Sequence, residues 1–379
     1  MRHRFEDVAI NSIAKRKPTD DDIGSYIGLE HLDTGSLSVT RYGSKVPIKG
    51  DKLVMEKGDV LFGRRNTYLK RAAIAPHDGL FSAHGMVLRP KEDVVSKEFF
   101  PFFIGSDYFF DSAIRISVGS LSPTVNWGTL KELEFELPSI DEQKRLAQIL
   151  WTATTAKNEY KELLFLTEQL VKSRFVEMFG DPVTNPMGWN TKPLSNHLKV
   201  VGGYAFSSGG FKDTGIPVLR IGNINTGIFT ANNLVFWEYD MKLERYMLYP
   251  GDLVISLTGT VGKDDYANVC ILGYEHERYY LNQRNAKLEL DSSLNTTYLL
   301  NILKIPKIKS GLTGISRGVR QANISNGDIL NLVIPIPPLP LQNEFADFVR
   351  QADKSKFELQ RTIDELEATY KSILRENLG

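Results

Sequence analysis

Two loops of the chain place guanidinium groups next to amide or hydroxyl groups. In the first half this segment is Arg64–Thr67, and in the second half it is Arg317–Asn323. Guanidinium donors match the acceptor edge of guanine, and amide groups match the mixed edge of adenine. Basic loop residues are also typical of ordinary solvated surface. The pattern therefore favours contact with nucleic-acid bases, and an ordinary surface stays open as the alternative.

Other cations extend this set of candidates. Lys70 and Arg71 follow the first loop. In the second half, Lys263, Arg278 and Arg284 are the next candidates after the two arginines of the second loop. The predicted DNA-contacting residues are Arg64, Arg65, Asn66, Lys70, Arg71, Lys263, Arg278, Arg284, Arg317, Arg320, Gln321 and Asn323.

Motifs for catalysis or metal binding are incomplete. Residues 258–264 have the spacing of the end of a phosphate-binding loop, but Leu257 replaces its first glycine and Asp264 its magnesium-binding hydroxyl. Residues 336–339 lack the amide and the aromatic ring of an adenine methyltransferase motif. The histidines are scattered, and His84, inside an apolar run, is expected to be buried. We therefore expect no catalytic residue and no metal site.

The chain contains an internal repeat. Ile116–Pro138 is matched without a gap by Ile315–Pro337, which lies 199 residues later (315 − 116). Upstream, Lys57–Phe62 corresponds to Pro250–Ile255, which lies 193 residues later (250 − 57). The repeat predicts two similar globular units.

The repeat also changes chemistry at matched positions. Arg317 and Arg320 replace Val118 and Leu121 of the first copy. A buried core would not accept two arginines. We therefore expect this part of the second copy to face solvent or a ligand.

Each half ends in a long helical pattern. Apolar residues alternate at spacings of four and three over about residues 141–179 and 342–376, which is typical of helices packed along a narrow stripe. Helices with one such stripe need a partner, so we expect them to pair antiparallel, as in a coiled coil. The predicted pairing residues are Leu146, Leu150, Tyr160, Leu164, Val171, Phe345, Val349, Leu359, Ile363, Leu366 and Ile373.

Short β-rich runs dominate the rest of each half. Residues 59–62, 252–257 and 133–137 are expected strands, and short helices are expected near 97–110 and 297–303. The pattern indicates an α/β (α+β) fold with a twisted, largely antiparallel or mixed sheet. The predicted organisation has globular domains at 1–138 and 181–337 and long helical spacers at 139–180 and 338–379.

Composition narrows the class of protein. The 379 residues carry no net charge, which argues against indiscriminate binding to nucleic acid but allows a local basic face. The single cysteine excludes an internal disulfide. No run approaches the ~20 apolar residues of a membrane span, and the first residues lack the apolar core of a signal peptide. We expect a cytoplasmic protein without membrane association.

Five segments carry a resemblance to a known family. They are Gly58–Arg65, Leu137–Gln143, Met178–Pro182, Gly215–Ile224 and Pro337–Gln342. Together with the duplication and the two helices, they resemble the specificity subunit of type I restriction-modification systems over essentially the whole chain. The chain departs from the family pattern at residues 340–342, where the second long helix often opens with Glu-Gln.

The resemblance implies separate roles for the globular units and the long helices. In that family each globular unit is a target recognition domain that reads one half of a split DNA sequence, and the helices separate the units and dock the methyltransferase. The implied partners are double-stranded DNA, two methyltransferase (modification) subunits and restriction/translocase subunits. No cofactor is expected in this chain, because S-adenosylmethionine, ATP and Mg²⁺ would be bound by the partner subunits.

Two alternatives stay open. The chain could be the recognition subunit of a modification-only or fused restriction system, or a bivalent scaffold that binds proteins without contacting DNA. Polar loops that diverge between matched anchors favour DNA recognition, since a scaffold for two equal partners would have no reason to diverge there.

Overall fold

The computed structural model describes the chain except for residues 264, 315–320 and 379. Arg317 and Arg320 therefore lie outside the described residues. The chain divides into two compact units, and each of them contains part of both long helices. Unit 1 comprises residues 1–163 and 359–379, and unit 2 comprises residues 164–358.

The central sheet of unit 1 has four antiparallel strands. Their order is β2 (Ala9–Ser12), β8 (Met86–Pro90), β5 (Val60–Phe62) and β6 (Ala72–Ile74). Two further sheets flank it: β1 (Arg2–Arg4) with β9 (Glu134–Glu136), and β3 (Lys15–Arg16) with β4 (Lys52–Met55) and β7 (Gly79–Phe81). The predicted strands at 59–62 and 133–137 lie in these sheets.

Unit 2 repeats this plan. Its four-stranded antiparallel sheet has the order β11 (Leu198–Gly202), β19 (Asn285–Leu290), β15 (Leu253–Ser256) and β17 (Val269–Ile271). Beside it lie β10 (Thr191–Pro193) with β21 (Val333–Pro335), and a sheet of β13 (Val235–Trp237), β12 (Ile216–Leu219), β18 (Tyr279–Leu281) and β14 (Met247–Leu248). A last pair joins β16 (Thr258–Thr260) to β20 (Gln321–Asn323). The predicted repeat is thus present in the strand order itself.

Short helices pack on each central sheet. In unit 1 these are α1 (Phe5–Val8), α2 (Phe100–Gly105), α3 (Asp107–Arg115) and α4 (Trp127–Leu130); in unit 2 they are α6 (Thr296–Leu303), α7 (Pro306–Thr313) and α8 (Asn326–Leu330). The core of unit 1 is built on phenylalanine rings: Phe109 lies 5.2 Å from Phe5 and 5.5 Å from Phe62, centroid to centroid. The α+β class predicted from the sequence is confirmed.

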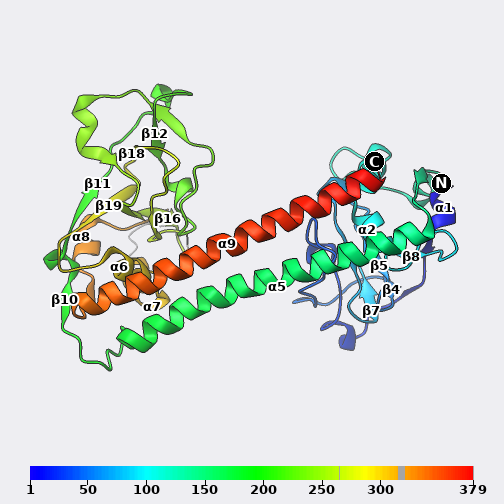
Figure 1. Cartoon of the computed structure of the whole chain (residues 1–379), viewed down its shortest axis with the longest axis horizontal. Helices are drawn as coiled ribbons and strands as arrows, with labels where there is room; N and C mark the ends of the chain where they lie inside the picture. The colour runs from blue at the N-terminus through cyan, green and yellow to red at the C-terminus, as the bar shows by residue number, and fades with distance from the viewer. Residues whose placement is uncertain (264, 315–320, 379) are drawn as a thin grey trace. The chain divides into compact units, whose positions relative to one another are not determined.

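Two 40-residue helices complete the chain, α5 (Ile140–Phe179) and α9 (Leu339–Leu378) (Figure 1). The second begins earlier than predicted, because a proline is tolerated in the first turn of a helix. In unit 1, Lys157 lies over the ring of Tyr370, and Lys161 lies 3.7 Å from Glu367. The residue numbers of the contacting side chains rise along α5 and fall along α9, so the two helices are antiparallel.

Unit 2 contains further contacts between the same two helices. Arg174 lies over the ring of Phe348 and 3.0 Å from Glu344, and the ring of Phe179 lies 5.4 Å from that of Phe345. The predicted antiparallel pairing of the long helices is confirmed by the contacts in unit 1, and in unit 2 the same two helices are in contact. Of the predicted pairing residues, Leu146, Leu150, Val171, Phe345, Val349 and Ile363 are buried, and Tyr160, Leu164, Leu359, Leu366 and Ile373 are half-buried.

A buried glutamine ties the start of α5 to unit 1. The side chain of Gln143 is inaccessible to solvent. Its Oε1 accepts a hydrogen bond from the backbone N–H of Ser96 at 2.8 Å, and its Nε2 donates to the carbonyls of Val94 and Pro138 at 3.1 and 3.0 Å. Loss of such a side chain would leave several buried polar groups without partners.

Gln342 repeats this arrangement at the start of α9, 199 residues later (342 − 143). Its Oε1 accepts from the N–H of Asn295 at 2.8 Å, and its Nε2 donates to the carbonyl of Pro337 at 2.7 Å. The sequence departs from the family pattern just before this residue, yet the glutamine that makes the contacts is kept.

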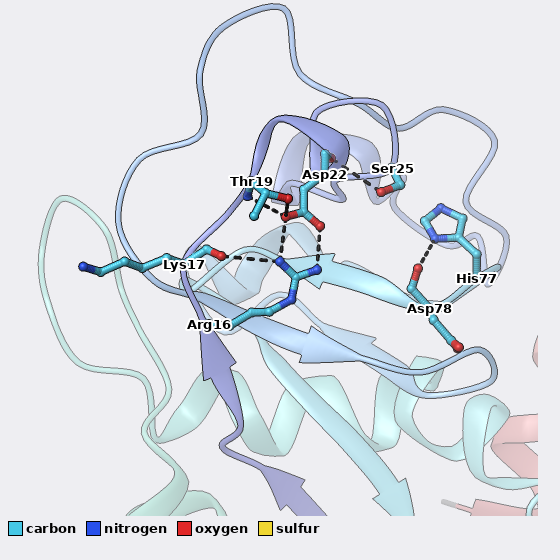
Figure 2. A network of polar contacts seen from close by, with 7 residues as sticks. All are labelled: Arg16, Lys17, Thr19, Asp22, Ser25, His77 and Asp78. Carbon is cyan, nitrogen blue, oxygen red and sulfur yellow. Dashed lines mark hydrogen bonds and ion pairs between the residues drawn. The ribbon is translucent and has the colours of Figure 1, made fainter.

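A polar network in unit 1 fixes the turn after β3. Arg16 makes two hydrogen bonds of 2.6 Å to the carboxylate of Asp22, which also accepts from the N–H of Thr19 at 2.7 Å (Figure 2). The Arg16 guanidinium holds the pKa of the Asp22 carboxyl well below its usual range. Asp22 is thus a structural anion, held charged by its partners.

Candidate nucleic-acid interface

In unit 1 the loop after β5 is paired to a distant segment. Arg65 forms an antiparallel bridge with Thr124. On either side of it, the N–H of Asn66 donates to the carbonyl of Pro123 at 2.8 Å, and the N–H of Val125 donates to the carbonyl of Arg64 at 2.9 Å. The backbone of this predicted base-reading loop is therefore held in one position.

Cations gather around this loop. Arg65 is exposed, and its Nη2 lies 3.3 Å from the hydroxyl of Ser122. Desolvation by neighbouring groups lowers the pKa of the exposed His84, and repulsion from Arg65, Arg64 and Lys52 lowers it further. Lys52, Arg64, Arg65 and His84 therefore share one electrostatic neighbourhood, which we name the unit 1 basic face. The expectation that His84 is buried was wrong, because its side chain is exposed next to the buried strand β8.

Three other predicted residues of unit 1 have roles inside the fold. Lys70 Nζ makes ion pairs with Asp107 and Asp111 of α3 at 2.6 and 2.8 Å. The guanidinium of Arg71 donates to the carbonyl of Leu29 at 2.8 Å. Asn66 adopts a left-handed backbone, with φ of 54°. These contacts hold the loop in shape, so Lys70 and Arg71 are less available to a ligand than Arg65 is.

Unit 2 has a pair of residues at the position of Arg65 and Thr124. In the β16–β20 ladder, Thr258 is the partner of Asn323. Thr258 lies 193 residues after Arg65 (258 − 65), and Asn323 lies 199 residues after Thr124 (323 − 124), which are the two offsets of the repeat. The same two paired positions thus carry an arginine and a hydroxyl side chain in unit 1, but a hydroxyl and an amide side chain in unit 2.

Arg284 occupies the position of His84. Val60 pairs with Leu88 in unit 1, and Leu253 pairs with Leu288 in unit 2, so equivalent residues of these strands lie 200 apart (288 − 88). Arg284 is exposed, and its carbonyl accepts from the N–H of Leu257, next to β16, at 2.8 Å. Strand register, which the sequence alone does not give, is what reveals that Arg284 and His84 are equivalent.

The other candidates of unit 2 are more dispersed. Lys263 is exposed in the turn after β16, where its N–H donates to the carbonyl of Thr260 at 3.0 Å. Arg278 stacks on the ring of Tyr239 at 5.2 Å and lines a hollow of about 410 Å³ beside β12, which no described residue of β16 or β20 lines. Asn323 is exposed at the end of β20. The structure therefore brings Asn323 and Arg284 close to β16 and places Arg278 on a different surface.

Other kinds of site are not found in the described part of the chain. Apart from residues 264, 315–320 and 379, no group of three or more His, Cys, Asp or Glu side chains could hold a metal ion. No helix within the described ranges is both long and apolar enough to cross a membrane.

The sequence matches one protein family in both halves. The family described as "Type I restriction modification DNA specificity domain" matches residues 12–164 and 186–368. A type I restriction enzyme MjaX specificity subunit of Methanocaldococcus jannaschii is 23% identical over 367 residues, which span 89% of this chain and 82% of the relative. The EcoKI specificity subunit of Escherichia coli is 24% identical over 186 residues, 45% of this chain and 38% of that protein.

Solved structures share the fold. A chain from a study of complex assembly and conformational transition of the type I R-M system superposes with a TM-score of 0.59 at 19% identity, covering 100% of this chain and 97% of that one. The S subunit of a type I system from M. genitalium also gives 0.59, at 11% identity, with coverage of 100% and 96%. With two matched domains, the chain belongs to the type I restriction-modification DNA specificity family, as a specificity subunit and not a catalytic one.

Proposed function

We propose that this chain reads a split double-stranded DNA target, one half with each unit, and holds the methyltransferase and endonuclease subunits of a type I restriction-modification complex. The observation that carries the proposal is the shared ladder position that pairs Arg65 with Thr124 in unit 1 and Thr258 with Asn323 in unit 2. Two domains that recognise different DNA sequences need the same backbone arrangement with different side chains on it.

The chemistry at these positions suits base recognition. Phosphate contacts orient a protein on DNA but carry no sequence information, whereas arginine matches guanine and amides match adenine in the major groove. Arg65, Arg284 and Asn323 are exposed on ordered loops or strand ends. Arg317 and Arg320 remain predicted readers, on sequence grounds alone.

The long helices suit the role of spacer. A helix of 40 residues is about 60 Å long. Half-sites on one face of B-DNA are ~34 Å apart for each helical turn of separation. A pair of such helices is long and stiff enough to set the distance between two half-sites.

Exposed apolar side chains on the helices are candidate docking points for the methyltransferase. In unit 2, Phe165, Leu166 and Leu170 of α5 and Phe357 of α9 are exposed, the last by 68%. Leu166 and Leu170 lie one turn apart on the same face. Contiguous exposed apolar surface is a mark of protein interfaces. Catalysis, with S-adenosylmethionine, ATP and Mg²⁺, would then belong to the docked subunits.

Methylation mapping tests the reading function. The chain is co-expressed with the methyltransferase subunit of the same system in a host that lacks adenine methylation, and the genome is read by methylation-sensitive long-read sequencing. A split motif with a fixed spacer is expected. A continuous motif, or no motif from a complex that assembles, would contradict the proposal, and absence of DNA binding would favour the bivalent protein scaffold.

Two double variants test the scaffold function. Leu166→Ser with Leu170→Ser should abolish co-purification of the methyltransferase, while Ile149→Ser, exposed on the same helix, should leave it unchanged. Replacing Leu164 and Ile363 with glutamate should also abolish it, because Ile363 is buried and its replacement would carry a charge there. Normal assembly of both double variants would refute docking on the helix pair.

A further inference from the structure

The segment that pairs with Arg65 ends in an exposed apolar tip. Leu121, at the apex of the loop between Val118 and Thr124, is 95% exposed, and Val118 is 62% exposed. Single exposed apolar residues are common on protein surfaces and need no explanation by themselves. The structure of this loop and the charges beside it are what distinguish Leu121.

The stem of the loop is closed by hydrogen bonds. Val118 and Thr124 exchange two backbone bonds, of 3.1 Å from the N–H of Val118 and 2.9 Å from the N–H of Thr124. Gly119 turns the chain with φ of +113°, a conformation that side chains disfavour. The hydroxyl of Ser117 donates to the carbonyl of Ile114 at 2.7 Å, which ties the stem to the end of α3. Leu121 therefore projects from a fixed base.

The tip stands beside the unit 1 basic face. Arg65 is bridged to Thr124 in the stem and contacts Ser122, the residue that follows Leu121. Arginines that meet phosphates or enter a groove bring the neighbouring side chains against the bases. Proteins that combine groove-entering cations with a projecting Leu, Ile, Phe or Met insert the apolar side chain between base pairs and unstack them in part.

We infer that Leu121 is a wedge that enters the DNA at the half-site read by unit 1 and partly unstacks one base-pair step. The inference rests on the proposed function, since it requires that unit 1 binds DNA. It adds a residue that acts by deforming DNA and not by hydrogen bonding. Specificity at this step would then follow how easily the step unstacks, with flexible pyrimidine–purine steps favoured.

The test uses the complex with its methyltransferase subunits, on a duplex that contains the mapped motif. The fluorescent adenine analogue 2-aminopurine replaces, in turn, each base of the unit 1 half-site except the methylated adenine. Wild type is expected to raise the fluorescence at one step, and Leu121→Ala to abolish that rise. The same substitution should weaken binding to the motif roughly ten-fold or more, and binding to a scrambled duplex less than about two-fold.

Controls separate the wedge from general damage. Ile149→Ala, an exposed apolar residue of α5 in the same unit, should leave both the fluorescence and the affinity unchanged. Leu121→Met, which keeps an apolar side chain of similar length, should restore most of the fluorescence rise. Since Leu121 is almost fully exposed, its truncation should not alter the melting temperature.

The outcomes are decisive in both directions. If wild type binds the split motif but no position of the half-site brightens, or if Leu121→Ala brightens it equally, the wedge is refuted while the proposed function stands. Loss of affinity without a change in fluorescence also refutes it, because the leucine would then touch bases without unstacking them. Failure of wild type to prefer the motif over scrambled DNA would instead refute the proposed function.

Discussion

Unit 1 and unit 2 keep the same strand order in the central sheet, but they differ at one position of the segment that joins β5 to β6 in unit 1 and β15 to β17 in unit 2. Lys70 in unit 1 and Ala267 in unit 2 both have left-handed backbones, with φ of 45° and 53°. They lie at equivalent points, because Val60 pairs with Ile74 as Leu253 pairs with Ile271. Unit 1 places there a lysine bound to Asp107 and Asp111, and unit 2 places a methyl group.

The comparison shows which features the repeat retains. Backbone conformation, strand register and the buried glutamines recur, whereas side chains that project from the loops do not. Backbone geometry is retained because a slip of one residue in the strand register would turn every side chain of that strand to the opposite face, while an exposed side chain can change without cost to the core. A duplicated fold can in this way acquire two specificities on one framework.

The largest effect should come from exchanging the second reader. Replacing residues 183–336 with the equivalent segment of a relative that recognises another sequence should change one half of the methylated motif completely and leave the other half and the spacer intact. Methylation mapping measures this. A change in both halves would show that the units do not read independently.

The two buried glutamines should have equal effects in the two units. Gln143→Leu and Gln342→Leu each deprive one N–H and two carbonyls of their side-chain partner, so each should lower the free energy of unfolding by about 2–4 kcal/mol. Urea denaturation gives the magnitude, and hydrogen exchange at residues 94–96 and 293–295 locates it.

Exposed glutamines on the same helices provide the controls for this pair. Gln148→Leu and Gln351→Leu should change the stability by less than about 0.5 kcal/mol. If the two buried positions differ strongly from each other, the equivalence of the two anchors is wrong.

Much of this frame could be predicted from the sequence. The long helices could be predicted because their apolar stripes repeat over many turns. Over 40 residues, a few positions that break the pattern do not obscure it. The repeat could be predicted because matched segments such as Lys57–Phe62 and Pro250–Ile255 contain buried strands, whose residues tolerate little change. The buried anchor role of Gln143 could have been suspected from its recurrence at Gln342 alone.

The site was less predictable, for a physical reason. The pairing of Thr258 with Asn323 joins segments 65 residues apart (323 − 258), and no local pattern announces it. Lys70 looks like a free cation in the sequence, but Asp107 and Asp111 reach it from another helix. His84 lies inside an apolar run and was expected to be buried, yet it is exposed in the turn between β7 and β8.

Single substitutions at the shared ladder position should affect different halves of the motif. Arg65→Ala should weaken binding to the cognate duplex by about 1–3 kcal/mol and relax the half-site of unit 1, and Asn323→Ala should relax that of unit 2. A residue that only contacts phosphate would weaken all sequences alike and reduce the salt dependence.

Titration against cognate and scrambled duplexes at two salt concentrations distinguishes these effects. Lys354→Ala, exposed on α9, is the control and should bind as wild type. Arg317→Ala and Arg320→Ala belong in the same series. If Arg65→Ala binds both duplexes like wild type, Arg65 is not a reader of unit 1.

The smallest effect should come from replacing Lys70 of unit 1 with alanine, the residue that unit 2 has at the equivalent position, Ala267. Lys70→Ala removes two partly exposed ion pairs, which are worth at most about 1 kcal/mol together, and leaves Asp107 and Asp111 close to each other. The loss should shrink in high salt, since screening weakens the ion pairs and the repulsion alike. DNA affinity should change little, because Lys70 is already engaged within the fold. A loss of specific binding as large as that of Arg65→Ala, without loss of stability, would instead make Lys70 a DNA contact that exchanges its aspartates for phosphate.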